Sequence, residues 1–169
     1  MDAIEFEKFI EVYETDIFSF CRYLAQDSHI AADLYQDTVL AAFEKRDKIV
    51  LTNNPKALFL SIAIGKWRNI RRKAGRRQAI APETSLSDIQ SEPATPSEAS
   101  PEALALSQLE KATIREALAK MDDKFRIPLI LHYYDHMDIK SIGEIINKPP
   151  GTVKSRLHKG RAILKKALE

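Results

Sequence analysis

The sequence predicts an all-α protein, with two small helical domains joined by a flexible acidic linker and a helix-turn-helix in the second domain. Apolar residues recur at three- and four-residue steps in both halves of the chain, which is helical spacing. No alternating apolar run bounded by turn residues suggests a strand. The expected boundaries are residues 1–77 for the first domain, 78–103 for the linker and 104–169 for the second domain.

Three helices are expected in the first domain. Apolar residues keep helical spacing over 4–24 and again over 30–43, and Asp27 or Ser28 is a suitable N-cap for the second helix. A third apolar segment begins at residue 58 and overlaps a run, 66–77, that holds seven Lys or Arg residues and no acid. Trp67 lies in this segment and is expected in the core, because tryptophan is usually well buried.

The linker prediction follows from composition. Residues 78–103 hold four of the eight prolines, many Ser and Thr, and no Lys or Arg. The acidic residues of this stretch are Glu83, Asp88, Glu92, Glu98 and Glu102. Such a segment cannot bury enough apolar surface to offset the entropy lost on ordering, so a flexible tether is expected.

Two helices separated by a tight turn are expected near the end of the chain. An apolar stripe over 106–121 and the shorter apolar segment "FRIPLILHYY" come first, and helices over 139–146 and 152–168 follow. The sequence "NKPPG" joins these last two helices. Pro150 has its φ angle set for a first helical turn, and Gly151 is predicted to let the two helices approach closely.

The last helix combines a face to bury with a basic face. Val153, Leu157 and Gly160 share one side, and Leu164 and Leu168 continue it. The opposite side carries Ser155, His158, Lys159, Ala162 and Lys166. A short helix, a tight turn and a basic helix form a helix-turn-helix, whose second helix fits the major groove of DNA. From residue 138 onward eight Lys or Arg face three acids, which favours DNA contact over a hairpin with a solvated charged face.

Composition excludes several other classes. The longest clearly apolar stretch, "ALFLSIAIG", is far short of the ~20 residues that a membrane span needs. The single cysteine, Cys21, fits a reducing compartment, so a cytoplasmic protein without membrane insertion is expected. His132 and His136 have a spacing that suits a metal ion, but no third ligand motif accompanies them. There is no Gly-rich phosphate loop or nucleophile elbow, so no catalytic residue, metal or cofactor is expected, and the protein is not expected to be an enzyme.

The motifs resemble a known family. "SIGEIINKPPGTVKSRLHKGRAILKKAL" is similar to region 4 of extracytoplasmic-function (ECF) sigma factors, and Arg126 matches an arginine usual in the preceding helix. "AADLYQDTVLAAF" and "LFLSIAIGKWRNIRRK" resemble two stretches of region 2 in the same family. Both matches occur in the family's order around a variable linker. Pro149 replaces a frequent serine, so the last helix is expected to lack a side-chain N-cap.

The resemblance implies an alternative sigma factor that binds core RNA polymerase and directs initiation by recognising the −10 and −35 promoter elements. The residues implied at the −35 element are Lys154, Ser155, His158 and Lys159 for bases, and Arg156 and Arg161 for phosphates. Those implied at the −10 element are Lys66, Arg68, Arg71 and Arg72, with Asn53, Asn54 and Lys56 where the family captures an unstacked base. Asp33, Gln36 and Asp37 lie on the helix that the family docks onto the polymerase.

The expected partners are core RNA polymerase, promoter DNA and an anti-sigma factor, which in relatives is often membrane-anchored. Two other interpretations stay open. A stand-alone helix-turn-helix repressor or activator would explain the C-terminal motif but not residues 31–73. An interaction adaptor would have no DNA role.

Overall fold

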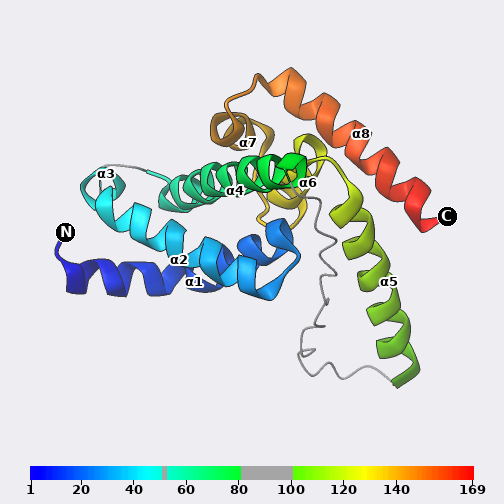
Figure 1. Ribbon diagram of the computed structural model, residues 1–169, viewed down its shortest axis with the longest axis horizontal. Coiled ribbons are helices and arrows are strands. Elements are labelled where there is room, and N and C mark those ends of the chain that lie inside the picture. Colours follow the sequence, from blue (N-terminus) through cyan, green and yellow to red (C-terminus); the bar gives the residue numbers. More distant parts are fainter. Residues whose placement is uncertain (51–52, 81–100) are drawn as a thin grey trace. The chain divides into compact units, whose positions relative to one another are not determined.

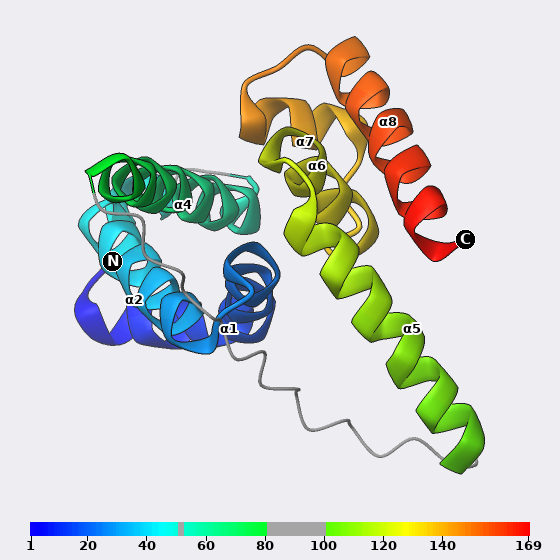
Figure 2. The same cartoon turned by 45° about the vertical axis from the view of Figure 1, so that its right-hand side comes forward.

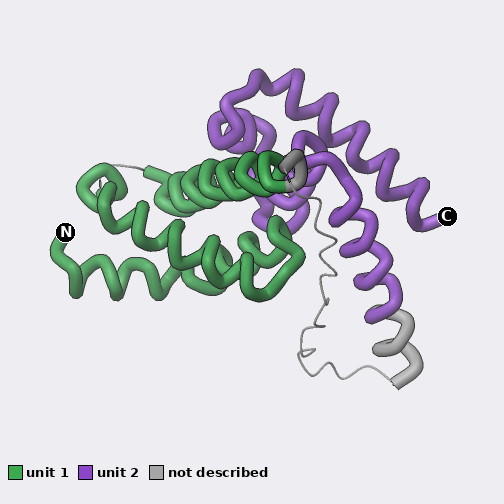
Figure 3. Tube along the Cα trace, in the orientation of Figure 1, with its two compact units in different colours: residues 1–89 green, residues 90–169 purple. Residues whose placement is uncertain are grey.

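A computed structural model of the protein describes residues 1–50, 53–80 and 101–169 (Figure 1). The described residues are helical with no strand, as predicted. The helices in chain order are α1 (Ala3–Ala25), α2 (Ser28–Glu44), α3 (Arg46–Val50), α4 (Pro55–Ile80), α5 (Pro101–Lys120), α6 (Asp123–Tyr133), α7 (Ile139–Ile146) and α8 (Pro150–Leu168). They form two compact units, with α1–α4 in the first and α5–α8 in the second (Figure 3).

The helices overlap both ends of the expected linker. Helix α4 continues to Ile80 and α5 begins at Pro101, so helix reaches into both ends of the range 78–103. Residues 81–100 lie outside the described residues. The flexible acidic tether therefore stays a prediction.

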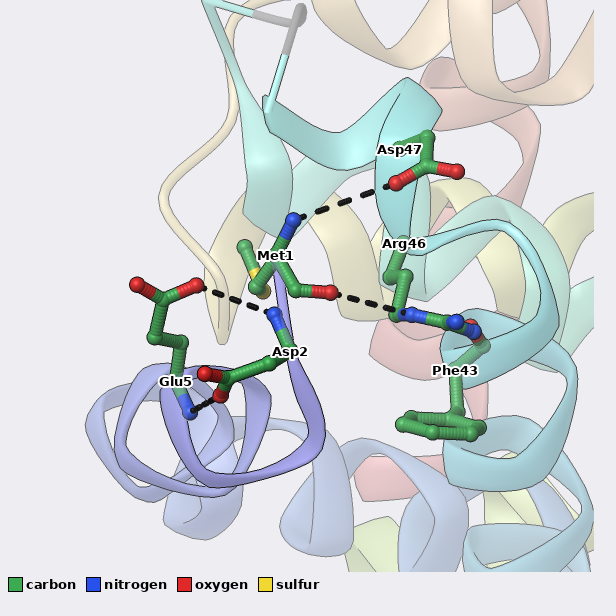
Figure 4. A network of polar contacts seen from close by, with 6 residues as sticks. All are labelled: Met1, Asp2, Glu5, Phe43, Arg46 and Asp47. Atoms are coloured by element: carbon green, nitrogen blue, oxygen red, sulfur yellow. Dashed lines mark hydrogen bonds and ion pairs between the residues drawn. The ribbon is translucent and has the colours of Figure 1, made fainter.

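The first helix starts with a reciprocal cap (Figure 4). The Asp2 carboxylate accepts from the Glu5 backbone N–H at 2.8 Å, and the Glu5 carboxylate accepts from the Asp2 N–H at 2.9 Å. The Met1 carbonyl accepts from Arg46 Nε at 3.1 Å, and the guanidinium of Arg46 lies 4.4 Å from the centre of the Phe43 ring. These contacts fasten the start of α1 to the junction of α2 and α3.

The core of the first unit lies between α1, α2 and α4, which pack on one another. Its largest fully buried side chains include Phe20 and Leu24 from α1, Leu34 from α2 and Phe59 from α4. The predicted N-cap is confirmed, because the Asp27 carboxylate accepts from the backbone N–H groups of His29 and Ile30 in the first turn of α2. The core therefore follows the predicted apolar stripes over most of their length.

Burial also determines the chemistry of the one cysteine. Cys21 is buried in the first unit, and desolvation raises the pKa of its thiol to about 12. A hydrogen bond with Thr38 opposes this rise but does not cancel it. The thiol therefore stays protonated at neutral pH and is a poor nucleophile.

In the second unit, α8 packs against α5, α6 and α7. Figure 2 shows α5 reaching well beyond the other three helices of this unit. Arg126 is buried in α6, and its guanidinium bonds to the carboxylate of Asp123 one turn earlier. This family-matching arginine therefore has an internal structural contact.

The prediction for Gly151 is wrong. A Cβ atom at Gly151 would meet nothing within 4 Å, so no close approach of helices occurs there. The close approaches lie at Gly143, where a Cβ would come 2.7 Å from the Lys148 carbonyl oxygen, and at Gly160, where it would come 2.7 Å from Leu129 Cδ1. The turn between α7 and α8 instead takes its left-handed residue from Asn147, with φ 57°.

Candidate nucleic-acid and polymerase interfaces

Helices α7 and α8 form the predicted helix-turn-helix. The Asp138 carboxylate caps α7 by accepting from the Ser141 N–H at 2.7 Å, and this bond lowers the pKa of Asp138 below its ordinary 3.8. After Asn147, Lys148 donates its N–H to the Gly143 carbonyl at 2.9 Å, and α8 begins at Pro150. Pro149 supplies no side-chain cap, as predicted. The capped helix α7 and the turn after it thus set the direction in which α8 starts.

Helix α8 divides into a buried and an exposed side. Val153, Leu157 and Gly160 are buried, whereas Leu168 is exposed, so the predicted stripe extends past the core. The side chains exposed along the first turns of the helix are Lys154, Ser155, His158 and Lys159. Each of these can donate a hydrogen bond to a base edge or a phosphate, and the helix offers them together.

The two predicted phosphate-contacting arginines of α8 differ in their surroundings. Arg156 is half-buried, whereas Arg161 is exposed. Arg161 Nη1 donates to the hydroxyl of Tyr133, at the end of α6, at 2.9 Å. Tyr133 was not among the predicted site residues, because 28 residues separate it from Arg161 and no local pattern joins them.

The basic end of α4 extends past the core of the first unit. Trp67 is only 5% exposed, which confirms that it is a core residue, and it is the last buried side chain of the described part of this helix. Every side chain over 71–77 is exposed, so this stretch presents five cations to solvent. Arg71 also lies over the Trp67 ring, 5.4 Å from its centre.

The remaining predicted −10 residues of α4 lie near this end. Lys66 is half-buried and Arg68 is exposed. Arg72 is exposed and bonds to the side chain of Asn69. Arg68, Arg71 and Arg72 share one side of the helix over two consecutive turns, whereas Lys66 lies on the opposite side.

The predicted base-capturing residues have other contacts in this structure. Asn53 is exposed, but the Asn54 side chain accepts from the Ala57 N–H at 3.2 Å, which is a cap for α4. Lys56 Nζ forms an ion pair with the Asp16 carboxylate of α1 at 3.1 Å. The capping oxygen and the ion pair both fix the start of α4. The role of Asp16 was not predicted, because it lies far from Lys56 in the sequence.

The acidic residues of α2 share an exposed face. Asp33, Gln36 and Asp37 are all exposed, while Leu34 and Thr38 on the other side are buried. Leu40, three residues past Asp37, belongs to the predicted apolar spacing over 30–43 but is 63% exposed. The face thus combines two carboxylates with a large apolar side chain, a mixture suited to a protein partner.

The histidine pair does not form a helical metal motif. His132 lies on α6 and its Nδ1 is 3.0 Å from the Met137 carbonyl oxygen, whereas His136 lies past the helix end with φ 54°. Across residues 1–50, 53–80 and 101–169, no cluster of three His, Cys, Asp or Glu side chains is placed to hold a metal ion. In the same part of the chain, no helix is both long and apolar enough to cross a membrane.

Two helical modules, one of them a helix-turn-helix with a basic second helix, define a DNA-binding protein of the transcription class. The family model for sigma-70 region 2 matches residues 9–77, and that for sigma-70 region 4 matches residues 111–164. The ECF RNA polymerase sigma factor SigW of Bacillus subtilis (strain 168) is 29% identical over 174 residues, which cover 99% of this chain and 90% of SigW.

The fold has a solved counterpart. The sigma factor RpoE from Bartonella quintana, crystallised with the anti-sigma factor NepR, matches with a TM-score of 0.81 at 22% identity. The match covers 97% of this chain and 96% of RpoE. The protein belongs to the ECF sigma factors of the sigma-70 family. As such it is an alternative sigma factor, which binds core RNA polymerase and directs promoter-specific initiation of transcription.

Proposed function

We propose that the exposed side of α8 reads the −35 element. Lys154, Ser155, His158 and Lys159 contact base edges, and Arg156 and Arg161 hold phosphates. The observation that carries this assignment is the exposure of the four base-facing side chains on the helix that leaves the capped turn. Phosphate contacts fix the register of the helix, and base contacts supply the specificity.

The end of α4 and the residues before it contact the −10 region. Lys66, Arg68, Arg71 and Arg72 neutralise phosphates, because they belong to a run, 66–77, that holds seven cations and no acid. Asn53 contacts the unstacked base directly. Asn54 and Lys56 join it by exchanging their bonds to the Ala57 N–H and to Asp16 for bonds to DNA.

The exposed face of α2 docks onto the polymerase. Asp33 and Asp37 are one helical turn apart, so both carboxylates reach the same basic surface on the partner. Gln36 lies between them, and Leu40 adds apolar contact at the end of the face. Residues 1–77 and 104–169 act as the two functional domains, and the acidic linker 78–103 connects them.

The protein acts in the cytoplasm as a non-catalytic factor. Sigma factors are known as non-catalytic initiation factors, and the sigma-70 region 2 and region 4 matches support this role. An anti-sigma factor is a partner, since the structurally similar RpoE was crystallised with one.

Run-off transcription tests the function. The purified protein, mixed with core RNA polymerase and genomic DNA of its own source, should produce transcripts with mapped start sites that share −10 and −35 elements. Core polymerase alone is the control. A protein that bound duplex promoter DNA tightly but never formed a stoichiometric complex with core polymerase would be a repressor or activator instead.

A further inference from the structure

We infer that Tyr133 is a further DNA-positioning residue, whose hydroxyl holds Arg161 against a promoter phosphate. This inference rests on the proposed contact of α8 with DNA. Tyr133 lies at the last position of α6 and Arg161 in the middle of α8, and the 2.9 Å bond joins Tyr133 Oη to Arg161 Nη1. Tyr133 is 53% exposed and Arg161 is exposed too, so the pair lies on the surface of this unit.

The bond leaves both groups with donors to spare. A guanidinium has five N–H donors, and Tyr133 occupies one of them. The tyrosine oxygen accepts this bond, so its own O–H hydrogen is still available to donate. The neutral O–H of Tyr133 and the charged N–H groups of Arg161 therefore lie side by side. This arrangement suits a phosphate, which has several acceptor oxygens.

Arg161 stands on one flank of α8. Lys154 precedes it by seven residues and Lys165 follows it by four, so the three side chains lie along one line of the helix, and all are exposed. The opposite flank carries Arg156, which is half-buried, and Ile163, which is 40% exposed. Beyond the base-facing Lys154, the flank with Tyr133 therefore carries two exposed cations, Arg161 and Lys165, that suit a phosphate backbone.

Tyr133 is itself held in place. Its ring stacks edge-on against the His132 ring, with ring centres 4.9 Å apart, and His132 Nδ1 lies 3.0 Å from the Met137 carbonyl. A fixed hydroxyl restricts the long arginine side chain before DNA arrives. Less rotamer entropy is then lost when the phosphate binds, and binding is tighter.

The test uses the full chain and a fluorescein-labelled duplex of about 30 base pairs, followed by anisotropy over a salt series. Arg161→Gln should lower the slope of log K against log salt by about one, as expected for one lost phosphate contact. Tyr133→Phe keeps the ring and should weaken binding by about 2- to 10-fold. In the Arg161→Gln background, Tyr133→Phe should have no further effect.

Three variants serve as controls. Tyr134→Phe removes a hydroxyl from the adjacent residue, and Lys111→Gln removes one charge from an exposed position of α5; both should bind like wild type. Arg161→Lys keeps the charge and should retain the salt slope. In the Arg161→Lys background, Tyr133→Phe should have little effect, because an ammonium lacks the planar set of N–H donors that can bond to the tyrosine and the phosphate together.

The outcomes separate the inference from the proposed function. If Arg161→Gln lowers the slope but Tyr133→Phe binds like wild type or more tightly, the inference is overturned and the −35 assignment stands. If Tyr133→Phe weakens both backgrounds equally, Tyr133 does not act through Arg161. If wild type shows no salt-dependent binding to DNA, the proposed DNA contact falls together with the inference.

Discussion

Replacing Gly160 by alanine tests how α8 is seated on α6. A Cβ atom at Gly160 would lie 2.7 Å from Leu129 Cδ1 and 3.0 Å from its Cγ, closer than van der Waals contact allows. Leu129 is only 3% exposed, so its side chain has no open space into which to rotate. The substitution must therefore displace packed atoms on α6 or shift α8 away from it.

Two opposing effects set the magnitude. Alanine favours a helix interior over glycine by about 1 kcal/mol, whereas inserting an extra carbon into a packed core costs about 1–3 kcal/mol. Gly160→Ala should thus lower the free energy of unfolding of the second unit by up to ~2 kcal/mol. Gly143→Ala should cost more, because the neighbouring atom is a backbone oxygen of Lys148 that the turn holds in place.

Gly151→Ala is the matched control. Nothing lies within 4 Å of its Cβ position, so only the helical preference acts, and the variant should be more stable than wild type by up to ~1 kcal/mol. The expected order of stability is Gly151→Ala, wild type, Gly160→Ala and Gly143→Ala.

Urea unfolding of the full chain measures this order. Trp67 is the only tryptophan and lies in the core of the first unit, so its fluorescence reports that unit. Far-UV circular dichroism reports the helices of both units. The glycine variants should move the dichroism transition and leave the Trp67 transition in place. Equal stability of Gly160→Ala and Gly151→Ala would refute the tight contact with Leu129.

The remaining predictions concern the two interfaces and the cap of α7. Lys159→Ala should relax discrimination at one −35 base by about 1–3 kcal/mol, measured by competition binding of promoter variants; a uniform loss over all sequences would identify a phosphate contact. Reversing Asp33 and Asp37 to lysine should weaken binding to core polymerase in a pull-down without changing duplex DNA binding, and equal loss of both would contradict the assignment. Asp138 stabilises α7 as a carboxylate, and its lowered pKa means that this stabilisation is complete above 3.8 and is lost as the pH falls through the lower folded value. Asp138→Asn keeps an acceptor for the Ser141 N–H but does not titrate between about pH 5 and about pH 2. The urea midpoint of this variant should therefore fall less over that range than the midpoint of wild type. Parallel curves would show that the Asp138 carboxylate does not cause the loss of stability in acid.

The sequence could predict the helices because periodicity and caps are local. Asp27 precedes α2 and caps it, and Val153 and Leu157 are buried at the predicted spacing. Periodicity also marks which face of a helix is apolar, but it does not say whether another element covers that face. Leu40 and Leu109 continue their apolar stripes, yet they are 63% and 65% exposed. Leu40 lies on the outward face of α2, and Leu109 lies on the part of α5 that extends past its neighbours (Figure 2).

Contacts between distant residues could not be predicted from the sequence. The ion pair of Lys56 with Asp16 and the bond of Arg161 with Tyr133 join different helices, and no spacing rule relates such residues. The error over Gly151 has the same origin. Several glycines lie near the turn and along α8. The packing of α8 on α6 and α7 determines at which of these positions a Cβ atom would clash, and the sequence does not contain that information.

The charge distribution explains how a chain with a net charge of only +2 contacts both DNA and a protein partner. The run 66–77 holds seven cations and no acid, and α8 carries further cations on its exposed side, whereas the exposed face of α2 is acidic. If charges of opposite sign were interspersed, their fields would largely cancel at distances greater than their spacing. Because they are gathered on separate helices, each surface keeps a local potential that attracts its own partner, and the total charge gives no sign of either.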